Sequence, residues 1–222
     1  MEKFITYHFT IRNKFCIIAS KIKFAVMARI KTDKDTTKRD VILNAAAALF
    51  RERGYKAASM RDLAEKVGIE AASLYNHIRS KVDLLHDICF NWANQCWEQI
   101  NQVEASPISS LQKVEDVLRF LIKQMIDNYN VSYVADHEWN HLSEPYLSNY
   151  QEQRHNYRKR LNHIITKGIN EGEIKPVNVP STIWLLLHAV NGIESWHRSR
   201  TRIDAKDLEE NIITILIGGL KK

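Results

Sequence analysis

The scarcity of helix-breaking residues most restricts the fold of this chain. Only seven of its 222 residues are Gly and four are Pro, whereas 45% are hydrophobic and 26% are charged. No run of alternating apolar and polar residues is long enough to indicate a sheet. The sequence therefore predicts an all-α protein with a sizeable hydrophobic core.

Helix start and stop signals divide the chain from Thr36 onward into about nine predicted helices. Ser59, Ser80 and Asp204 each precede an acidic residue by three positions, which is typical of a capped helix start. Glycine or proline follows most of the apolar stripes and marks their ends. The predicted helices cover residues 36–53, 59–67, 70–77, 80–103, 110–129, 131–142, 145–171, 180–200 and 204–220.

Basic residues are concentrated in the first part of the chain. Residues 1–85 contain 17 Lys and Arg against 9 Asp and Glu, a net charge of +8, whereas residues 86–222 contain 15 against 17 and carry −2. Such an asymmetry indicates that one end of the protein meets a polyanion. A solvated basic surface would give the same count and remains the alternative.

Residues 1–27 are apolar and basic, and we expect them to form a poorly ordered extension, with Met27 as a candidate start of translation. Lys and Arg interrupt every apolar run there, so no segment approaches the roughly 18 residues of a membrane span. The segment FCIIAS is too short for the centre of a signal peptide. Cys16, Cys89 and Cys96 form no disulfide pattern. We expect a cytoplasmic protein with no membrane partner.

Residues 59–78, SMRDLAEKVGIEAASLYNHI, form a candidate helix-turn-helix motif. Leu63, Val67 and Leu74 would pack its two short helices against the preceding helix. The polar side of the second helix would then be free to enter the major groove of DNA. Many helical hairpins share this spacing, so the motif needs support from its surroundings.

A longer stretch, residues 42–85, resembles the DNA-binding domain of the tetracycline-repressor (TetR) family without gaps. The resemblance is carried by AAALF, GY, RDLA, VGI, SLY, a His before an apolar residue, and SK followed by LL. It implies a homeodomain-like three-helix domain at 28–85 and a larger helical effector-binding and dimerisation domain at 86–222. It also implies a non-enzymatic transcriptional regulator without a cofactor, most simply a homodimeric repressor that leaves a palindromic DNA operator when a small molecule binds. The helix from Ser80, shared by both domains, would transmit the signal.

The resemblance assigns DNA contacts residue by residue. Ser59 and the amides of its helix would hold a phosphate, and Arg61 would read a guanine edge through a bidentate hydrogen bond. Arg39 would add attraction to the DNA backbone. The complete predicted set is Lys38, Ser59, Arg61, Ser73, Tyr75, Asn76, His77 and Lys81.

The predicted recognition helix departs from many relatives, because it begins with Glu70, Ala71 and Ala72 in place of Ser, Lys and Gly. Alanine can contact only a thymine methyl group, so the operator sequence stays open. For Tyr75 the alternative role is a core aromatic, and for His77 it is a helix cap.

A largely apolar effector cavity is expected among the middle helices. The segment around His137 resembles a TetR subgroup that senses acyl-coenzyme A thioesters, and Arg154, Arg158, Lys159 and Arg160 would receive phosphates. Core packing of the aromatics, an exposed basic helix face and a neutral drug-like effector are the alternatives. The predicted effector contacts are Trp92, Tyr129, Tyr133, His137, Trp139, Arg154, Tyr157, Arg158, His188 and Asn191, with Trp97 as a further candidate.

The last two predicted helices are expected to supply the dimer surface. The final one is apolar around most of its circumference, as expected of a helix buried between its own domain and a partner subunit. Burial within one subunit is the alternative. The predicted dimer contacts are Trp184, Leu187, Ile193, Trp196, Ile212, Ile213 and Leu216.

His137, Glu138 and His141 spell the His-Glu-x-x-His motif of many zinc peptidases. Such a site needs a third ligand. The extended motif would have Gly and His at positions 144 and 147, where this chain has Glu144 and Leu147. We therefore predict no metal site and keep a zinc metallohydrolase and an effector-independent DNA-binding protein as the two rival functions.

Overall fold

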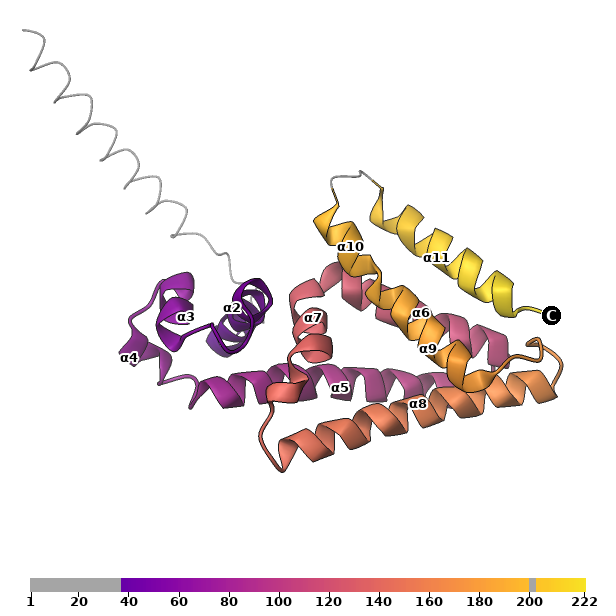
Figure 1. The fold of residues 1–222 in the computed structure, drawn as a ribbon, viewed down its shortest axis with the longest axis horizontal. Helices are drawn as coiled ribbons and strands as arrows, with labels where there is room; N and C mark the ends of the chain where they lie inside the picture. Colours follow the sequence, from indigo (N-terminus) through magenta and orange to yellow (C-terminus); the bar gives the residue numbers. More distant parts are fainter. Residues whose placement is uncertain (1–36, 200–202) are drawn as a thin grey trace, which may run out of the picture.

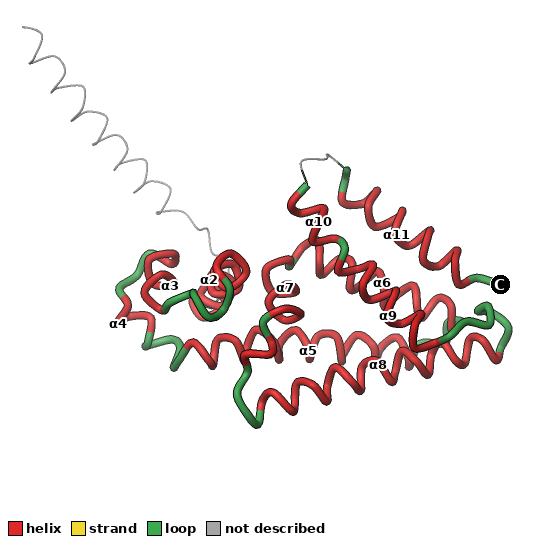
Figure 2. The backbone as a smooth tube through the Cα atoms, viewed as in Figure 1, coloured by secondary structure: helices red, strands yellow, loops and turns green. Residues whose placement is uncertain are grey.

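The computed structural model describes residues 37–199 and 203–222 and is all-α (Figure 1). Over these ranges Figure 2 shows helices joined by loops and turns, with no β-strand. One isolated antiparallel bridge joins Ile174 to Lys221 near the end of the chain. The predicted extension at 1–27 lies outside the described residues.

The N-terminal helices form a small three-helix unit, which we call the head. Thr37 and Ser59 begin its first two helices through capping boxes with Asp40 and Asp62. Gly68, with a φ of 76°, ends the second helix in the left-handed conformation that glycine adopts without strain. The head consists of α2 (Lys38–Arg53), α3 (Met60–Val67) and α4 (Ala71–Leu74).

The remaining helices form the body. Helix α5 leaves the head and runs along the body beside α8, while α7 lies between α2 and the rest of the body (Figure 1). The body consists of α5 (Lys81–Ala105), α6 (Ser110–Asp127), α7 (Tyr129–His137), the short 3-10 helix η1 (Trp139–His141), α8 (Tyr146–Asn170), α9 (Val179–Asn191), α10 (Ile193–Arg198) and α11 (Ala205–Leu220).

Two hydrophobic cores hold these helices together. One lies within the body and includes Leu118 and Leu161. The other begins in the head with Leu63, passes through α5 and ends on Val134 and Tyr150 of the body. Because apolar side chains of both units share this second core, the head is packed against the body and is not merely tethered to it.

The predicted all-α fold with a helix-turn-helix head is confirmed, and each of the nine predicted helices has a counterpart. Two of them are divided: 131–142 breaks at Glu138 into α7 and η1, and 180–200 breaks at Gly192 into α9 and α10. Glycine has a low helix propensity, which accounts for the second break. The predicted helix at 70–77 is shorter than expected, because the chain turns after Leu74.

None of the described helices has the length and apolar character needed to cross a lipid bilayer.

Candidate functional site

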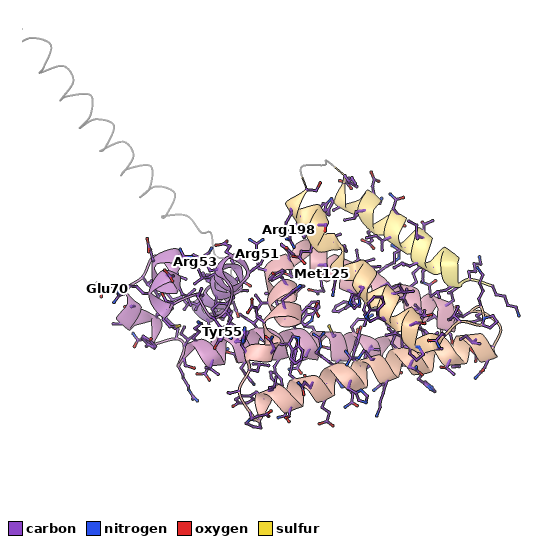
Figure 3. The ribbon with its side chains drawn as sticks, in the orientation of Figure 1. Arg51, Arg53, Tyr55, Glu70, Met125 and Arg198 are labelled. Atoms are coloured by element: carbon purple, nitrogen blue, oxygen red, sulfur yellow. The ribbon has the colours of Figure 1, made fainter. Side chains whose placement is uncertain are left out.

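The turn that follows α4 presents polar side chains to solvent. Ser73, Tyr75 and Asn76 are exposed, and Tyr75 keeps 53% of its surface, so its alternative role as a core aromatic is wrong. The buried Leu74 and Ile78 fix this turn against the head. Glu70, just before α4, lies at the end of the head remote from the body (Figure 3).

At the start of α3, the side chains of Ser59 and Asp62 hydrogen-bond to each other and to the first backbone N–H groups of the helix. The Ser59 hydroxyl donates to the Asp62 carboxylate at 2.6 Å and accepts the Asp62 backbone N–H at 3.1 Å. Arg53 forms an ion pair with the same carboxylate at 2.8 Å. The hydrogen bonds from Ser59 and the charge of Arg53 lower the pKa of Asp62. A phosphate at this helix start would therefore meet backbone amides more readily than the Ser59 hydroxyl.

Of the basic side chains predicted to contact DNA, some already bind other residues of the protein and others are exposed. Lys81 Nζ donates to the Lys56 carbonyl at 3.2 Å and lies 4.4 Å from the ring centroid of Tyr55, so its position is set by the head itself. Arg39 pairs with Asp87 of α5. Lys38 and Arg61 are exposed.

Tyr55 lies where the head meets the body (Figure 3). The Glu138 carboxylate accepts its backbone N–H at 3.2 Å, and the His141 ring stacks on its side chain with a centroid separation of 5.5 Å. His141 Nε2 is also 3.4 Å from the Glu138 carboxylate. Glu138 and His141, the Glu and the second His of the His-Glu-x-x-His pattern, thus bind the head.

The first His of that motif, His137, is the last residue of α7, and its Nδ1 lies 3.0 Å from the Tyr133 carbonyl oxygen. His137 and His141 consequently do not share a continuous helix. In residues 37–199 and 203–222, no three His, Cys, Asp or Glu side chains are grouped as metal ligands. The zinc alternative therefore has no geometric support.

An aromatic ladder forms a second connection between head and body. The Arg51 guanidinium of α2 lies 5.1 Å from the ring centroid of Tyr129, which stacks on His197 at 4.0 Å. Tyr129 is followed by Tyr133, which stacks on His137 at 4.1 Å. Since Arg51 belongs to the head and the four rings belong to the body, this ladder joins the two units.

A cavity of about 450 Å³ opens among α5, α6, α7, α8 and α9, within the size range of small-molecule sites. Tyr129, Tyr133, His137 and Trp139 do not line it, which corrects their assignment as effector contacts. The rings of Tyr129, Tyr133 and His137 belong to the aromatic ladder. The ring of Trp139 lies under the Arg154 guanidinium. The predicted residues that do line it are Trp92, Trp97, Arg154, Tyr157, Arg158, His188 and Asn191.

The polar side of the cavity is built around Asp136, which the sequence did not single out. One carboxylate oxygen pairs with Arg154 at 2.9 Å, and the other accepts a hydrogen bond from Asn191 at 2.8 Å. Burial alone would lower the pKa of Arg154, but Asp136 and Tyr150 outweigh it and the pKa is raised. Asn191, a predicted effector contact, is therefore already bound to Asp136 of the same chain.

Arg158 lies one turn after Arg154 and differs from it in its surroundings. Partial burial, followed by repulsion from Arg154, lowers the pKa of Arg158. The side chain is exposed at the cavity, and no described carboxylate pairs with it. Its charge is therefore available to an anion.

Two residues that line the cavity each hold a buried polar atom without a hydrogen-bond partner among the described residues: the Gln153 side-chain oxygen and the Tyr157 hydroxyl. Burial raises the pKa of Tyr157, so the phenol stays protonated. An unsatisfied buried polar atom costs about 1–3 kcal/mol. The sequence analysis did not predict Gln153 as a cavity residue. Its position four residues before Tyr157 on α8 places both side chains on one face of the helix and could have indicated it.

The predicted dimer residues fall into three groups. Trp184 is 59% exposed, and it also lines the cavity together with Leu187. Ile193 and Ile213 are buried in their own protomer, which corrects their assignment to an interface. The half-buried members are Leu187, Trp196, Ile212 and Leu216. Leu185 and Ile215, which were not predicted, are exposed.

A helix-turn-helix head joined to a helical body with a ligand-sized cavity defines a DNA-binding regulator of the one-component type. Residues 42–88 match the family described as bacterial regulatory proteins, tetR family. Residues 107–220, just over half of the chain, match the tetracyclin repressor-like C-terminal domain. The chain belongs to the TetR family of transcriptional regulators, a non-enzymatic class, as its sequence predicted.

Similar proteins include the HTH-type transcriptional repressor KstR2 of Mycobacterium tuberculosis, 22% identical over 188 residues, with 84% of this chain and 94% of KstR2 covered. The negative transcriptional regulator IcaR of the icaADBC biofilm operon of Staphylococcus aureus is 27% identical over 165 residues, with 72% of this chain and 82% of IcaR covered.

Two solved structures show the same fold. KstR2 of Mycobacterium tuberculosis has a TM-score of 0.76 at 22% identity, with 87% of this chain and all of that chain covered. AibR in complex with isovaleryl coenzyme A and operator DNA has a TM-score of 0.70 at 22% identity, with 82% of this chain and 98% of the AibR chain covered.

Proposed function

We propose that this protein is a ligand-released transcriptional repressor that acts in the cytoplasm as a homodimer on a palindromic operator. Residues 28–85 would bind DNA, and residues 86–222 would bind the effector and the second subunit. The observation that carries this proposal is the ligand-sized cavity in a body that is packed directly against the head. The names of KstR2 and IcaR, a repressor and a negative regulator, support repression.

We propose an acyl-coenzyme A thioester, or another small hydrophobic molecule with an anionic group, as the effector. The apolar walls formed by Trp92, Leu121 and Leu187 suit an acyl chain, and the exposed Arg158 suits a phosphate or carboxylate. Arg160 is less suited than predicted, because it pairs with Glu104 and lies over Trp97. The isovaleryl coenzyme A bound by AibR supports this class of ligand.

A cavity of this size argues against the effector-independent alternative. A neutral drug-like effector remains the second candidate, because Arg154 is already neutralised by Asp136.

Pairing of two subunits would use the exposed apolar residues Trp184, Leu185 and Ile215 on α9 and α11. One helix-turn-helix unit binds DNA weakly, and two such units reach half-sites about 34–36 Å apart. The function therefore depends on a dimer that holds two heads at a set separation.

The signal would travel through α5 and through α7. Asp136 lies at the cavity, and Glu138, two residues later, holds the backbone N–H of Tyr55 in the head. An anionic effector that draws Arg154 away from Asp136 would disturb the end of α7 and hence Tyr55. Induction requires that the effector bind more tightly to the state with wrongly spaced heads, because equal affinity shifts no population.

The test is a titration of the complex between the purified protein and the DNA upstream of its own gene. Short- and medium-chain acyl-coenzyme A thioesters should lower operator affinity, whereas free coenzyme A should not. Intrinsic fluorescence from Trp92 and Trp97 at the cavity should change over the same concentrations. If no thioester changes either the fluorescence or the operator affinity, this effector class is wrong.

A further inference from the structure

Two separate polar links join the head to the two ends of α7. Just after the last residue of α7, the Glu138 carboxylate accepts the backbone N–H of Tyr55. At the first residue of α7, the guanidinium carbon of Arg51 lies 5.1 Å from the ring centroid of Tyr129. Arg51 and Tyr55 lie at different points along the boundary between head and body (Figure 3). The two links together restrict rotation of the head more than either would alone.

The ring of Tyr129 is the main described contact of the Arg51 side chain with the body. The Nε atom of Arg51 is buried and has no hydrogen-bond partner among the described residues. The carboxylate of the adjacent Glu52, also in the head, is 3.7 Å from the guanidinium. Attraction between a guanidinium and an aromatic ring contributes about 0.5–2 kcal/mol, with the larger values where water is excluded.

Tyr129 is held in turn by His197 of α10. The two rings stack with their centroids 4.0 Å apart and an angle of 10° between their planes. His197 Nε2 lies 2.7 Å from the backbone carbonyl oxygen of Met125. Because a carbonyl oxygen only accepts hydrogen bonds, Nε2 carries the proton and donates it. The imidazole is therefore fixed by the Tyr129 ring on its face and by α6 at its edge.

This imidazole is connected to the effector cavity through two elements. Met125, whose carbonyl it binds, lines the cavity from α6. Asn191, the last residue of α9, lines the cavity as well, and α10 follows α9 directly. A ligand that displaced α6 or α9 would move the imidazole and, through the Tyr129 ring, the head.

We propose that His197 and Arg51 are positioning residues of this regulator, through which the wall of the cavity sets the angle of the head. Their link runs through contiguous packed side chains, as coupling between sites requires of a direct route. It differs from the link through Glu138, because it starts on α6 and α9 and reaches the opposite end of α7. Occupation of the cavity thereby tilts α7 and the head with it. This inference rests on the proposed effector cavity and assigns its regulation.

The first test measures the position of the head without DNA or effector. Glu65→Cys on α3 and Gln151→Cys on α8, both exposed positions, carry spin labels for double electron-electron resonance. Cys16 is replaced by Ser, whereas Cys89 and Cys96 are buried and escape labelling. Dilution into excess unlabelled protein restricts the measurement to distances within one subunit.

Arg51→Met should broaden this distance distribution, because the head loses one of its two links. Arg51→Lys keeps the charge over the Tyr129 ring and should restore most of the sharpness. Lys56→Met removes an exposed positive charge from the same unit and should leave the distribution sharp. Circular dichroism checks that each variant folds.

The second test separates the two contacts of His197. His197→Gln keeps a donor for the Met125 carbonyl but removes the ring, so the distance distribution should broaden. His197→Phe keeps a ring against Tyr129 but removes the donor, so the distribution without effector should stay sharp.

Operator affinity with and without octanoyl coenzyme A measures the coupling. The thioester should weaken operator binding about tenfold in the unmodified protein and about threefold or less in His197→Phe and Arg51→Met. Calorimetry should give nearly the same affinity for the thioester in all three proteins. A purely structural role would change stability without separating head position, coupling and effector affinity in this way.

The outcomes distinguish this inference from the proposed function. It is overturned if Arg51→Met leaves the distance distribution sharp, if Lys56→Met broadens it equally, or if His197→Phe keeps the full effect of the thioester. If octanoyl coenzyme A binds to none of the proteins, the thioester proposal fails. The distances in Arg51→Met and His197→Gln then still decide whether this link positions the head.

Discussion

At the scale of single residues, ion pairing decides which basic side chains can meet a ligand. Arg154 and Arg160 belong to the same basic run on α8 as Arg158, yet each is paired with a carboxylate of a neighbouring helix. A guanidinium paired in this way contributes less net charge to its surroundings. Arg158 at the cavity and Arg61 on the head are exposed, and no described carboxylate forms an ion pair with either of them.

Arg61→Ala should weaken operator binding by about 1–3 kcal/mol and relax specificity at one base pair, as expected for a bidentate base contact. Electrophoretic mobility shift with operator variants measures both effects. Lys38→Ala should instead weaken all sequences equally and reduce the salt dependence. The matched control is Lys123→Ala on the exposed surface of α6. Equal losses on every operator variant for Arg61→Ala would contradict its role in base recognition.

Arg158→Gln should lower the affinity for anionic effectors about tenfold, because it removes a charge-assisted contact at the cavity. The neutral alcohols of the same chain length should be unaffected. Lys159→Gln, its exposed neighbour, does not line the cavity and serves as the control. Calorimetric titration measures both. An equal loss in the two variants would show that only the general positive charge of α8 matters.

At the scale of secondary-structure elements, α7 and η1 connect the cavity to the head. The same short segment carries Asp136 at the cavity and Glu138 and His141 against Tyr55. The sequence predicts a helix here but gives no sign of this dual role. The role depends on contacts of this segment with the head and with the other helices of the body. These contacts join residues that are far apart in the chain.

Glu138→Ala should leave effector affinity nearly unchanged while weakening the effect of the effector on operator binding. The reason is that the variant removes the carboxylate that accepts the Tyr55 N–H. Coupling between sites is typically about 1–3 kcal/mol, and we expect the variant to lose at least half of it. Operator titrations with and without effector measure this coupling. Glu152→Ala, an exposed residue of α8, should keep the coupling intact; full coupling in Glu138→Ala would exclude this route.

Gly168→Ala should destabilise the body by about 1–3 kcal/mol, because a Cβ at this buried helical position would lie 2.6 Å from Ile174 and 2.9 Å from Ser110. Gly218→Ala on α11 has no atom within 4 Å of the added Cβ and should be neutral or stabilising by up to about 1 kcal/mol. Urea denaturation of both variants provides the comparison. A loss of stability in Gly218→Ala comparable to that of Gly168→Ala would contradict this explanation.

At the scale of the whole molecule, the exposed apolar residues of α9 and α11 are the strongest sign of a second subunit. Leu185 and Ile215 are 58% and 72% exposed, although both belong to helices that are otherwise rich in apolar residues. Large exposed apolar side chains mark an interaction surface, and both helices pack on α6. The predicted interface contained both helices but also Ile193 and Ile213, which face the protomer's own core.

Leu185→Glu combined with Ile215→Glu should convert the proposed dimer into a monomer, because it places charges in the centre of the proposed interface. Operator affinity should fall steeply with it, while the head itself stays folded. Sedimentation velocity and mobility shift measure the two effects. Lys206→Glu, an exposed charge reversal on α11, should leave the dimer intact. A double variant that remains dimeric would place the interface elsewhere.

The sequence by itself determined the helices, the helix-turn-helix motif and the family, because these depend on local signals: caps such as Ser59, apolar periodicity, and a contiguous motif. It could not sort the aromatic residues of the middle helices. Trp92 and Tyr157 line the cavity while Tyr129 and Tyr133 join head to body, since that difference depends on how each helix is rotated against its neighbours. The tertiary structure alone decided these roles, because contacts between residues distant in the chain set the orientation of every side chain.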